Sequence, residues 1–132
     1  MRRAKLHAHE VTRVILTATM THQKYEEVTV ESLMKKRRAD GFIDAGWHYF
    51  VDKNAKVHFG VPADERGSMF PRYEKDTVVI LIEGSGMYTK EQYAVVKRLV
   101  ADLQKQYPKA LLTLHYELFR GINPGIERGD IQ

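Results

Sequence analysis

The most constraining feature of the sequence is the apolar run Thr77–Ile82 (TVVILI). Charged residues precede this run, and Gly84 and Gly86 follow it. A strand with one solvated face alternates apolar and polar residues, whereas an uninterrupted apolar run predicts a strand that is covered on both faces. Covering both faces requires further layers of secondary structure. We therefore expect a central strand here, in an α/β fold.

Two helices are predicted from their start and stop signals. Thr29 is expected to cap a helix over Val30–Ala39, which ends at Gly41. Thr89-Lys-Glu-Gln92 is a capping-box pattern, and it predicts the start of a second helix. The helical spacing after this box places four apolar side chains on one face, namely Tyr93, Val96, Val100 and Leu103.

The remaining strands follow from β-rich runs. Val11–Ala18 and Ala110–Leu114 are predicted to be buried strands, and Gly46–Asp52 and Lys56–Phe59 flank a turn as a β-hairpin. The resulting order is β-α-β-β-β-α-β. It predicts an α/β fold with a central mixed β-sheet flanked by helices.

Two segments lack such patterns. Gly60–Lys75 contains prolines and a glycine, and we expect a long loop there. Whether this loop covers a groove is not predicted from the sequence. Gly121–Gln132 is expected to be a tail. The 132 residues fit a single domain that spans residues 1–132.

Composition excludes several classes of protein. The chain has no cysteine, so disulfides, thiolate catalysis and thiolate metal ligands are ruled out. No apolar run approaches the roughly 20 residues that span a membrane, and no signal-peptide pattern is present. We therefore expect no membrane partner. The net charge of +4 favours acidic partners.

Several segments together carry a family resemblance. Gly41–Val51 (GFIDAGWHYFV) joins a glycine and an aspartate to a Gly-Trp-His step before an apolar strand. Leu114-His115 is followed by Asn123-Pro124-Gly125. In this order and spacing, the segments resemble the N-acetylmuramoyl-L-alanine amidases of the phage-lysozyme type, which share their fold with the peptidoglycan recognition proteins. The resemblance implies the amidase fold over nearly the whole chain.

The resemblance also implies a zinc site, which this sequence retains only in part. The family supplies a histidine at the end of the first strand, a histidine after the last strand, and a cysteine or aspartate eight residues beyond. Thr17, His115 and Asn123 stand at these positions. Thr and Asn offer neutral oxygen atoms, which are poor zinc ligands. Because a catalytic zinc needs about three protein ligands, we expect no metal, no other cofactor and no amidase activity.

The residues that assist catalysis in the family are replaced as well. The catalytic tyrosine of the family corresponds to Trp47, the basic residue near the third ligand to Gly121, and the loop histidine to Met69. His48 matches a family residue inside the hairpin, and we expect it to be buried and hydrogen-bonded. The remnant groove is then expected to comprise Thr17, Trp47, His48, Met69, His115, Gly121 and Asn123.

Two other clusters could carry function. His7 and His9 would share one face of a strand and could bind zinc with a third ligand, although a solvated segment is the simpler interpretation. Lys35-Lys36-Arg37-Arg38 is expected to be a solvated helix end, because consecutive helical residues point in different directions. It lacks the interleaved aromatic residues of a single-strand binder, so nucleic acid is not an expected partner.

Three functional hypotheses remain. The leading one is a catalytically inactive amidase-fold protein, encoded by a phage or prophage, that binds a host or phage protein as an inhibitor or assembly component. Amidases of this type include phage members that bind the phage RNA polymerase, which gives a protein partner precedent. The resemblance also implies a location in the cytoplasm of the bacterial host or in association with a virion. The alternatives are a non-hydrolytic binder of peptidoglycan or muropeptides, and an active amidase with a relocated metal site.

Overall fold

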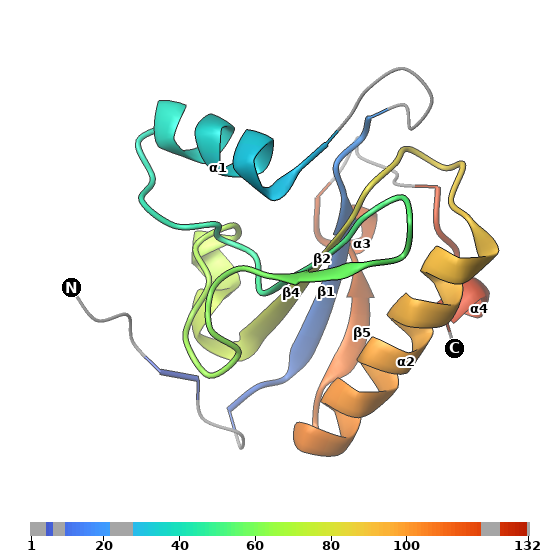
Figure 1. Cartoon of the computed structure of the whole chain (residues 1–132). Helices are drawn as coiled ribbons and strands as arrows, with labels where there is room; N and C mark the ends of the chain where they lie inside the picture. The colour runs from blue at the N-terminus through green and yellow to red at the C-terminus, as the bar shows by residue number, and fades with distance from the viewer. Residues whose placement is uncertain (1–4, 7–9, 22–27, 120–124, 132) are drawn as a thin grey trace.

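A five-stranded mixed sheet forms the centre of the molecule (Figure 1). The computed structural model describes residues 5–6, 10–21, 28–119 and 125–131. The strands are β1 (Arg13–Ala18), β2 (Tyr49–Val51), β3 (Val57–Phe59), β4 (Thr77–Ile82) and β5 (Leu111–Leu114). Their order is β3-β2-β4-β1-β5. β4 runs parallel to β1 and β2, β5 runs parallel to β1, and β3 is antiparallel to β2. The predicted mixed sheet and its central strand β4 are confirmed.

One long helix covers each face of the sheet (Figure 1). α1 (Val30–Ala39) lies on one face and α2 (Lys90–Gln106) on the other. α1 has the predicted bounds, and both helices begin at the predicted caps. Within the described residues, no helix is both long and apolar enough to cross a membrane. Three short elements complete the fold: a 3-10 helix, η1 (Pro71–Asp76), and the single helical turns α3 (His115–Leu118) and α4 (Arg128–Ile131).

The face that α2 covers is densely packed. Val78, Ile80 and Ile82 of β4 point to this side, because alternate residues of a strand share a face. They form one apolar cluster with Val96 and Val100 of α2. All five side chains are at most 1% exposed. Each such burial contributes about 1.5–3 kcal/mol, so this face supplies much of the stability of the fold.

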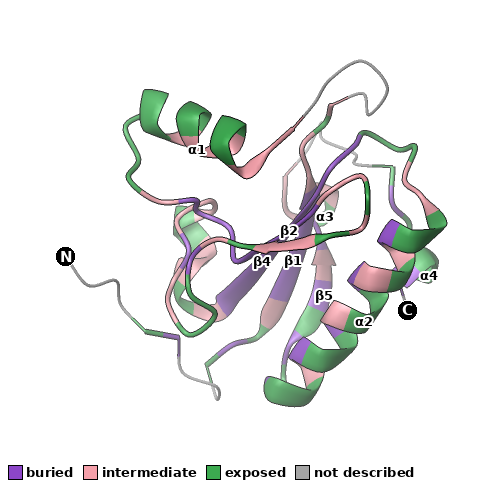
Figure 2. Cartoon of the chain, in the orientation of Figure 1, coloured by how far each residue is buried: buried purple, intermediate pink, exposed green. Residues whose placement is uncertain are grey.

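The opposite face is more loosely covered. Val79 and Leu81 of β4 point toward α1 and are buried. The residues of α1 that pack against this cluster, such as Leu33 and Met34, are only half-buried. No residue of α1 is buried, which Figure 2 shows as a helix without purple. α1 therefore depends less on the core than α2 does.

Both long helices begin with the same local device. Thr29 Oγ1 accepts a hydrogen bond from the Ser32 amide, and Ser32 Oγ accepts one from the Thr29 amide. Thr89 and Gln92 form the equivalent pair at the start of α2. Reciprocal bonds of this kind satisfy amide groups that a helix leaves without partners at its first turn. The two predicted N-caps are confirmed.

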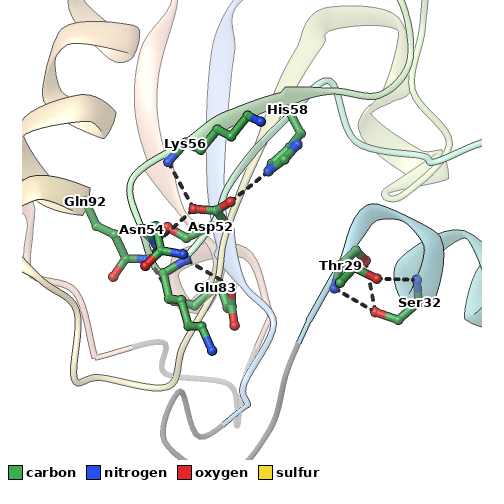
Figure 3. A network of polar contacts seen from close by, with 9 residues as sticks. Thr29, Ser32, Asp52, Asn54, Lys56, His58, Glu83 and Gln92 are labelled. Atoms are coloured by element: carbon green, nitrogen blue, oxygen red, sulfur yellow. Dashed lines mark hydrogen bonds and ion pairs between the residues drawn. The ribbon is translucent and has the colours of Figure 1, made fainter.

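Gln92 also joins segments that are distant in the sequence. Its Nε2 donates to the carbonyl oxygens of Asp52 at 3.0 Å and Glu83 at 2.9 Å. The Glu83 carboxylate in turn accepts from the Lys53 amide at 2.9 Å. Gln92 and Glu83 are at most 1% exposed. This buried network, shown in Figure 3, ties the start of α2 to the end of β4 and to the β2–β3 hairpin.

Three segments differ from expectation. β2 and β3 are shorter than the predicted hairpin strands. The expected loop Gly60–Lys75 contains the start of η1, where Pro71 occupies a first helical position that tolerates proline. In the expected tail, Ile126 and Ile131 are buried. These elements are too short to show a periodic pattern in the sequence.

Candidate ligand groove

A groove with a volume of about 400 Å³ lies between α1 and the sheet. Ala18 and Leu81, near the carboxyl ends of β1 and β4, contribute to it from the sheet. Leu33 and Lys36 line it from α1, and Met69 lines it from the segment before η1. In sheets with parallel strands, ligands commonly bind outside the carboxyl ends of the strands. The position and volume of the groove therefore suit a small ligand.

Trp47 and Met69, two of the predicted groove residues, both line this space. Trp47 is 1% exposed, and its carbonyl oxygen accepts from the Val61 amide at 2.9 Å. A Cβ atom at Gly60 would lie 2.6 Å from Cε3 of the indole, so glycine is needed there. The Met69 amide donates to the carbonyl oxygen of Gly46 at 3.2 Å. The segment Gly60–Lys75 thus forms a wall of the groove and does not fill it.

Arg37 fixes the end of α1 beside the groove. Its Nε donates to the carbonyl oxygen of Asp44 at 3.2 Å, and its guanidinium also contacts the Asp44 carboxylate and Ser68 Oγ. The guanidinium carbon lies 3.8 Å from the centre of the Phe42 ring. Gly46 leaves room for it, since a Cβ there would lie 2.6 Å from Arg37 Nη2. This side chain, rather than a buried apolar face, anchors α1.

Thr17 and His115 contact each other directly. β1 and β5 are parallel neighbours with Leu16 opposite Leu114, so the next residue of each chain segment is brought together. The distance from Thr17 Oγ1 to His115 Nδ1 is 2.6 Å, which is a short hydrogen bond. Thr17 is 4% exposed. The two strand ends are therefore joined by this side-chain bond.

Aromatic rings enclose His115 on further sides. The Phe70 and Phe119 rings lie 5.2 and 5.1 Å from the imidazole, both edge-on, and Tyr73 contacts Phe119 at 6.0 Å. Desolvation by burial lowers the pKa of His115 below its ordinary value of 6.5. The imidazole is therefore neutral at pH 7.

The described residues do not fit the zinc that the resemblance implies. Two ligands of one tetrahedral zinc, each about 2.0–2.1 Å from the metal, stand about 3.3 Å apart. Thr17 Oγ1 and His115 Nδ1 are closer than this and bond to each other, so no ion fits between them. Among the described residues, no three His, Cys, Asp or Glu side chains gather as a metal site. The chemistry of the donors and their spacing both disagree with zinc.

His48 is held by structural hydrogen bonds and is not among the residues that line the groove. It is 1% exposed, and its Nδ1 accepts from the Val79 amide at 3.0 Å. Its Nε2 lies 2.7 Å from the Glu65 carbonyl oxygen. Because Nδ1 is an acceptor, the proton resides on Nε2 and is donated to Glu65. The expectation of a buried, hydrogen-bonded histidine agrees with this geometry.

A second, smaller pocket of about 270 Å³ continues along α1. Val28 borders both pockets, and Thr29 at the start of α1 faces the β2–β3 hairpin (Figure 3). In this hairpin the Asp52 carboxylate lies 2.8 Å from His58 Nε2. Burial acts to raise the pKa of Asp52, but the hydrogen bonds from His58 and from two backbone amides outweigh it and lower the pKa. The carboxylate is therefore ionised and held in place.

The structure assembles part of the predicted site. Trp47 and Met69 line the groove, whereas Thr17 and His115 meet beside Phe70, the residue after Met69. The contribution of α1 to the groove was not predicted from the sequence, although Arg37 shares a face with Leu33 at an i, i+4 spacing that could have indicated it. Four predicted positions lie outside the described residues: His7, His9, Gly121 and Asn123.

The chain is similar to amidases and to peptidoglycan recognition proteins. An endolysin of Enterobacteria phage K11 is 22% identical over an alignment of 100 residues, and the match covers 70% of this chain and 66% of the endolysin. The chain thus spans just under two thirds of that relative. The amidase LysC from Clostridium intestinale superposes with a TM-score of 0.76 at 18% identity, covering 91% of this chain and 81% of LysC.

A second similar structure is the ectodomain complex of peptidoglycan recognition proteins LCa and LCx with tracheal cytotoxin bound. It has a TM-score of 0.72 at 15% identity, and the match covers 91% of this chain and 78% of that chain. At these identities the superpositions establish the fold. The family model for N-acetylmuramoyl-L-alanine amidase matches residues 7–124, which is most of the sequence. This chain therefore belongs to the N-acetylmuramoyl-L-alanine amidase family.

Proposed function

We propose that this protein binds a peptidoglycan fragment in the groove between α1 and the sheet and does not hydrolyse it. The observation that carries this proposal is the direct hydrogen bond between Thr17 and His115. It stands where the family places two of its zinc ligands. Without the metal, neither a zinc-bound water nor Lewis-acid polarisation of the amide is supplied. A binding role remains for the groove.

The groove offers several kinds of contact to such a ligand. Trp47 and Leu81 are apolar, Thr19 and Ser32 bring hydroxyl groups, and Lys36 brings a cation. A muropeptide combines sugar rings, small peptide side chains and free carboxylates. Pockets for small ligands are commonly built from apolar walls and a few polar groups that fix orientation. The lining of the groove matches this combination.

Two measurements test the absence of hydrolysis. Elemental analysis of protein purified without a histidine tag, after dialysis against zinc-free buffer, is expected to find zinc far below one atom per chain. Dye-labelled sacculi are expected to release no dye with this protein while a working amidase releases it. One zinc per chain together with dye release would overturn the non-hydrolytic part of the proposal.

Neighbouring lysines of α1 provide a matched test of binding. Lys36 lines the groove, whereas Lys35 is exposed and does not. We expect Lys36→Glu to weaken muropeptide binding about three- to ten-fold in calorimetry, because a carboxylate would face the carboxylates of the ligand. Lys35→Glu is the control and should leave the affinity unchanged. If wild-type protein binds no muropeptide, or if both variants lose affinity equally, the groove is not the binding site.

The proposal also includes a phage or prophage origin, a location in the host cytoplasm or in a virion, and a protein partner. Phage or prophage origin accords with the similarity to a phage endolysin. Location in the host cytoplasm or in a virion stays a prediction, and copurification with intact virions would decide between the two. A protein partner, the leading expectation from the sequence, is compatible with a ligand in the groove because it would use another surface.

A further inference from the structure

The C-terminal end of α1 presents an exposed surface of two cations and two apolar side chains, which we call the α1 corner. It comprises Lys35, Arg38, Phe42 and Ile43. Ile43 is 86% exposed and Phe42 is 37% exposed. Among the described residues, the side chains of Lys35 and Arg38 form no ion pair and no hydrogen bond. A single exposed apolar side chain is common on protein surfaces, but Ile43 stands on a backbone that is fixed on both sides.

The backbone under the α1 corner is fixed by a Schellman motif. The Phe42 amide donates to the carbonyl oxygen of Arg37, and the Gly41 amide donates to that of Arg38, both at 3.0 Å. Gly41 has a φ of +93°, which glycine adopts without steric strain. The cap thus sets the direction in which the chain leaves α1 and holds Phe42 against the guanidinium of Arg37.

Ile43 is held from its other side as well. The following residue, Asp44, accepts from Arg37 through its carbonyl oxygen and from Ser68 Oγ through its carboxylate at 2.9 Å. Ile43 therefore projects into solvent between two anchored residues. Ordering a contact residue before binding reduces the entropy lost on association. A rigid, exposed isoleucine is suited to act as an anchor for a partner.

The two exposed cations of the α1 corner indicate the chemistry of that partner. Lys35 and Arg38 stand one helical turn apart, so their side chains share a face. This face is distinct from the one that carries Leu33 and Arg37 into the groove. Two cations and an exposed apolar side chain at the same helix end complement an acidic segment with an apolar side chain. We propose that the α1 corner binds an acidic segment of a protein partner, with Ile43 contacting an apolar side chain of that segment.

Nucleic acid is a poorer match to the same surface. Bases stack on aromatic rings, and one face of the only ring in the α1 corner, Phe42, is covered by the Arg37 guanidinium. The aliphatic Ile43 offers no stacking plane. The observations therefore favour a protein, and an oligothymidine serves as the competing probe. Since the α1 corner lies outside the groove, this inference does not depend on muropeptide binding.

The test measures fluorescence anisotropy with two short labelled peptides. One is rich in Glu and carries a central Leu-Phe pair, and the other has the same charge with Ser in place of this pair. We expect the first peptide to bind more tightly, and added salt to weaken it. Lys35→Glu combined with Arg38→Glu should reduce its affinity by about ten-fold or more, and Ile43→Ser by about five-fold.

The same substitutions at other exposed positions serve as controls. Lys105→Glu with Lys109→Glu changes the charge equally, and Leu111→Ser removes an apolar side chain that is 70% exposed on β5. Both controls should bind the peptide like the wild type. The proposal is overturned if the controls lose as much affinity as the corner variants, if the apolar peptide does not bind, or if the oligothymidine binds as tightly. Lys36→Glu, which tests the groove, keeps the two proposals separable.

Discussion

The two faces of the sheet are covered by helices that start alike but pack differently. α1 and α2 both begin with a Thr-based capping box. α2 then buries Val96, Val100 and Leu103 against the sheet, whereas α1 buries no residue and leaves a groove of about 400 Å³. α1 is instead held by its caps and by Arg37. A helix built from local signals can thus line a groove because it is not needed to fill the core.

The two helices should differ most in the unfolding free energy that is lost when the same side chain is removed from each. Leu103→Ala should lower the free energy of unfolding by about 3 kcal/mol, since Leu103 is 3% exposed and the cavity would be lined by the core. Leu33→Ala should lower it by about 1 kcal/mol or less, because Leu33 already borders an open groove. Urea denaturation of both variants measures the difference. Equal losses would mean that α1 belongs to the core as much as α2 does.

Removal of each N-cap should give a smaller difference in stability between the two helices. Loss of either N-cap, by Thr89→Ala or Thr29→Ala, should weaken its helix by about 1 kcal/mol. The Thr89 variant should show this as a lower global stability, because α2 is part of the core. The Thr29 variant should show it as faster trypsin cleavage within Lys35–Arg38, with global stability nearly unchanged. Resistance of that segment to trypsin in the Thr29 variant would contradict a locally held α1.

The Thr17–His115 hydrogen bond lies on the same face of the sheet as α1, and its contribution to stability can be measured. Thr17→Val keeps the shape but removes the hydroxyl that bonds Nδ1 at 2.6 Å. We expect a loss of about 1 kcal/mol in unfolding free energy. Thr113→Val on β5, whose hydroxyl makes only a 3.4 Å contact with its own strand, is the control. A Thr17 variant as stable as the control would show that this bond adds nothing to the fold.

The smallest expected effect is on pH dependence. The folded-state pKa of His115 lies below 6.5 because burial disfavours the imidazolium. The unfolded chain therefore binds a proton first as the pH falls, so stability decreases below about pH 6.5 and is unaffected above it. His115→Gln should reduce this decrease, as seen in unfolding experiments across the range. A His115 resonance that titrates above pH 6.5 in NMR would reverse the sign.

Local signals made the frame of the molecule predictable. The bounds of α1, both caps and the buried run of β4 follow from neighbouring residues alone. The burial of Ile126 and Ile131 does not, because it depends on packing between segments far apart in the sequence. For the same reason, the family resemblance placed Thr17 and His115 at the positions of two zinc ligands but did not predict the hydrogen bond between them. That bond arises from the register of β1 and β5.

The hydrogen bonds around Gln92 make the start of α2, the end of β4 and the β2–β3 hairpin unfold locally as one unit. Its amide bonds the Thr89 backbone, the Asp52 carbonyl and the Glu83 carbonyl together, and the Glu83 carboxylate holds the Lys53 amide. None of these bonds can be released without disturbing the same buried side chains. The backbone amide protons of Lys53 and Thr89, 36 positions apart in the sequence, should therefore exchange with solvent in one shared event. α1 buries no residue and is joined to the rest of the chain by the partly exposed Arg37 side chain, so its amide protons should exchange independently and sooner.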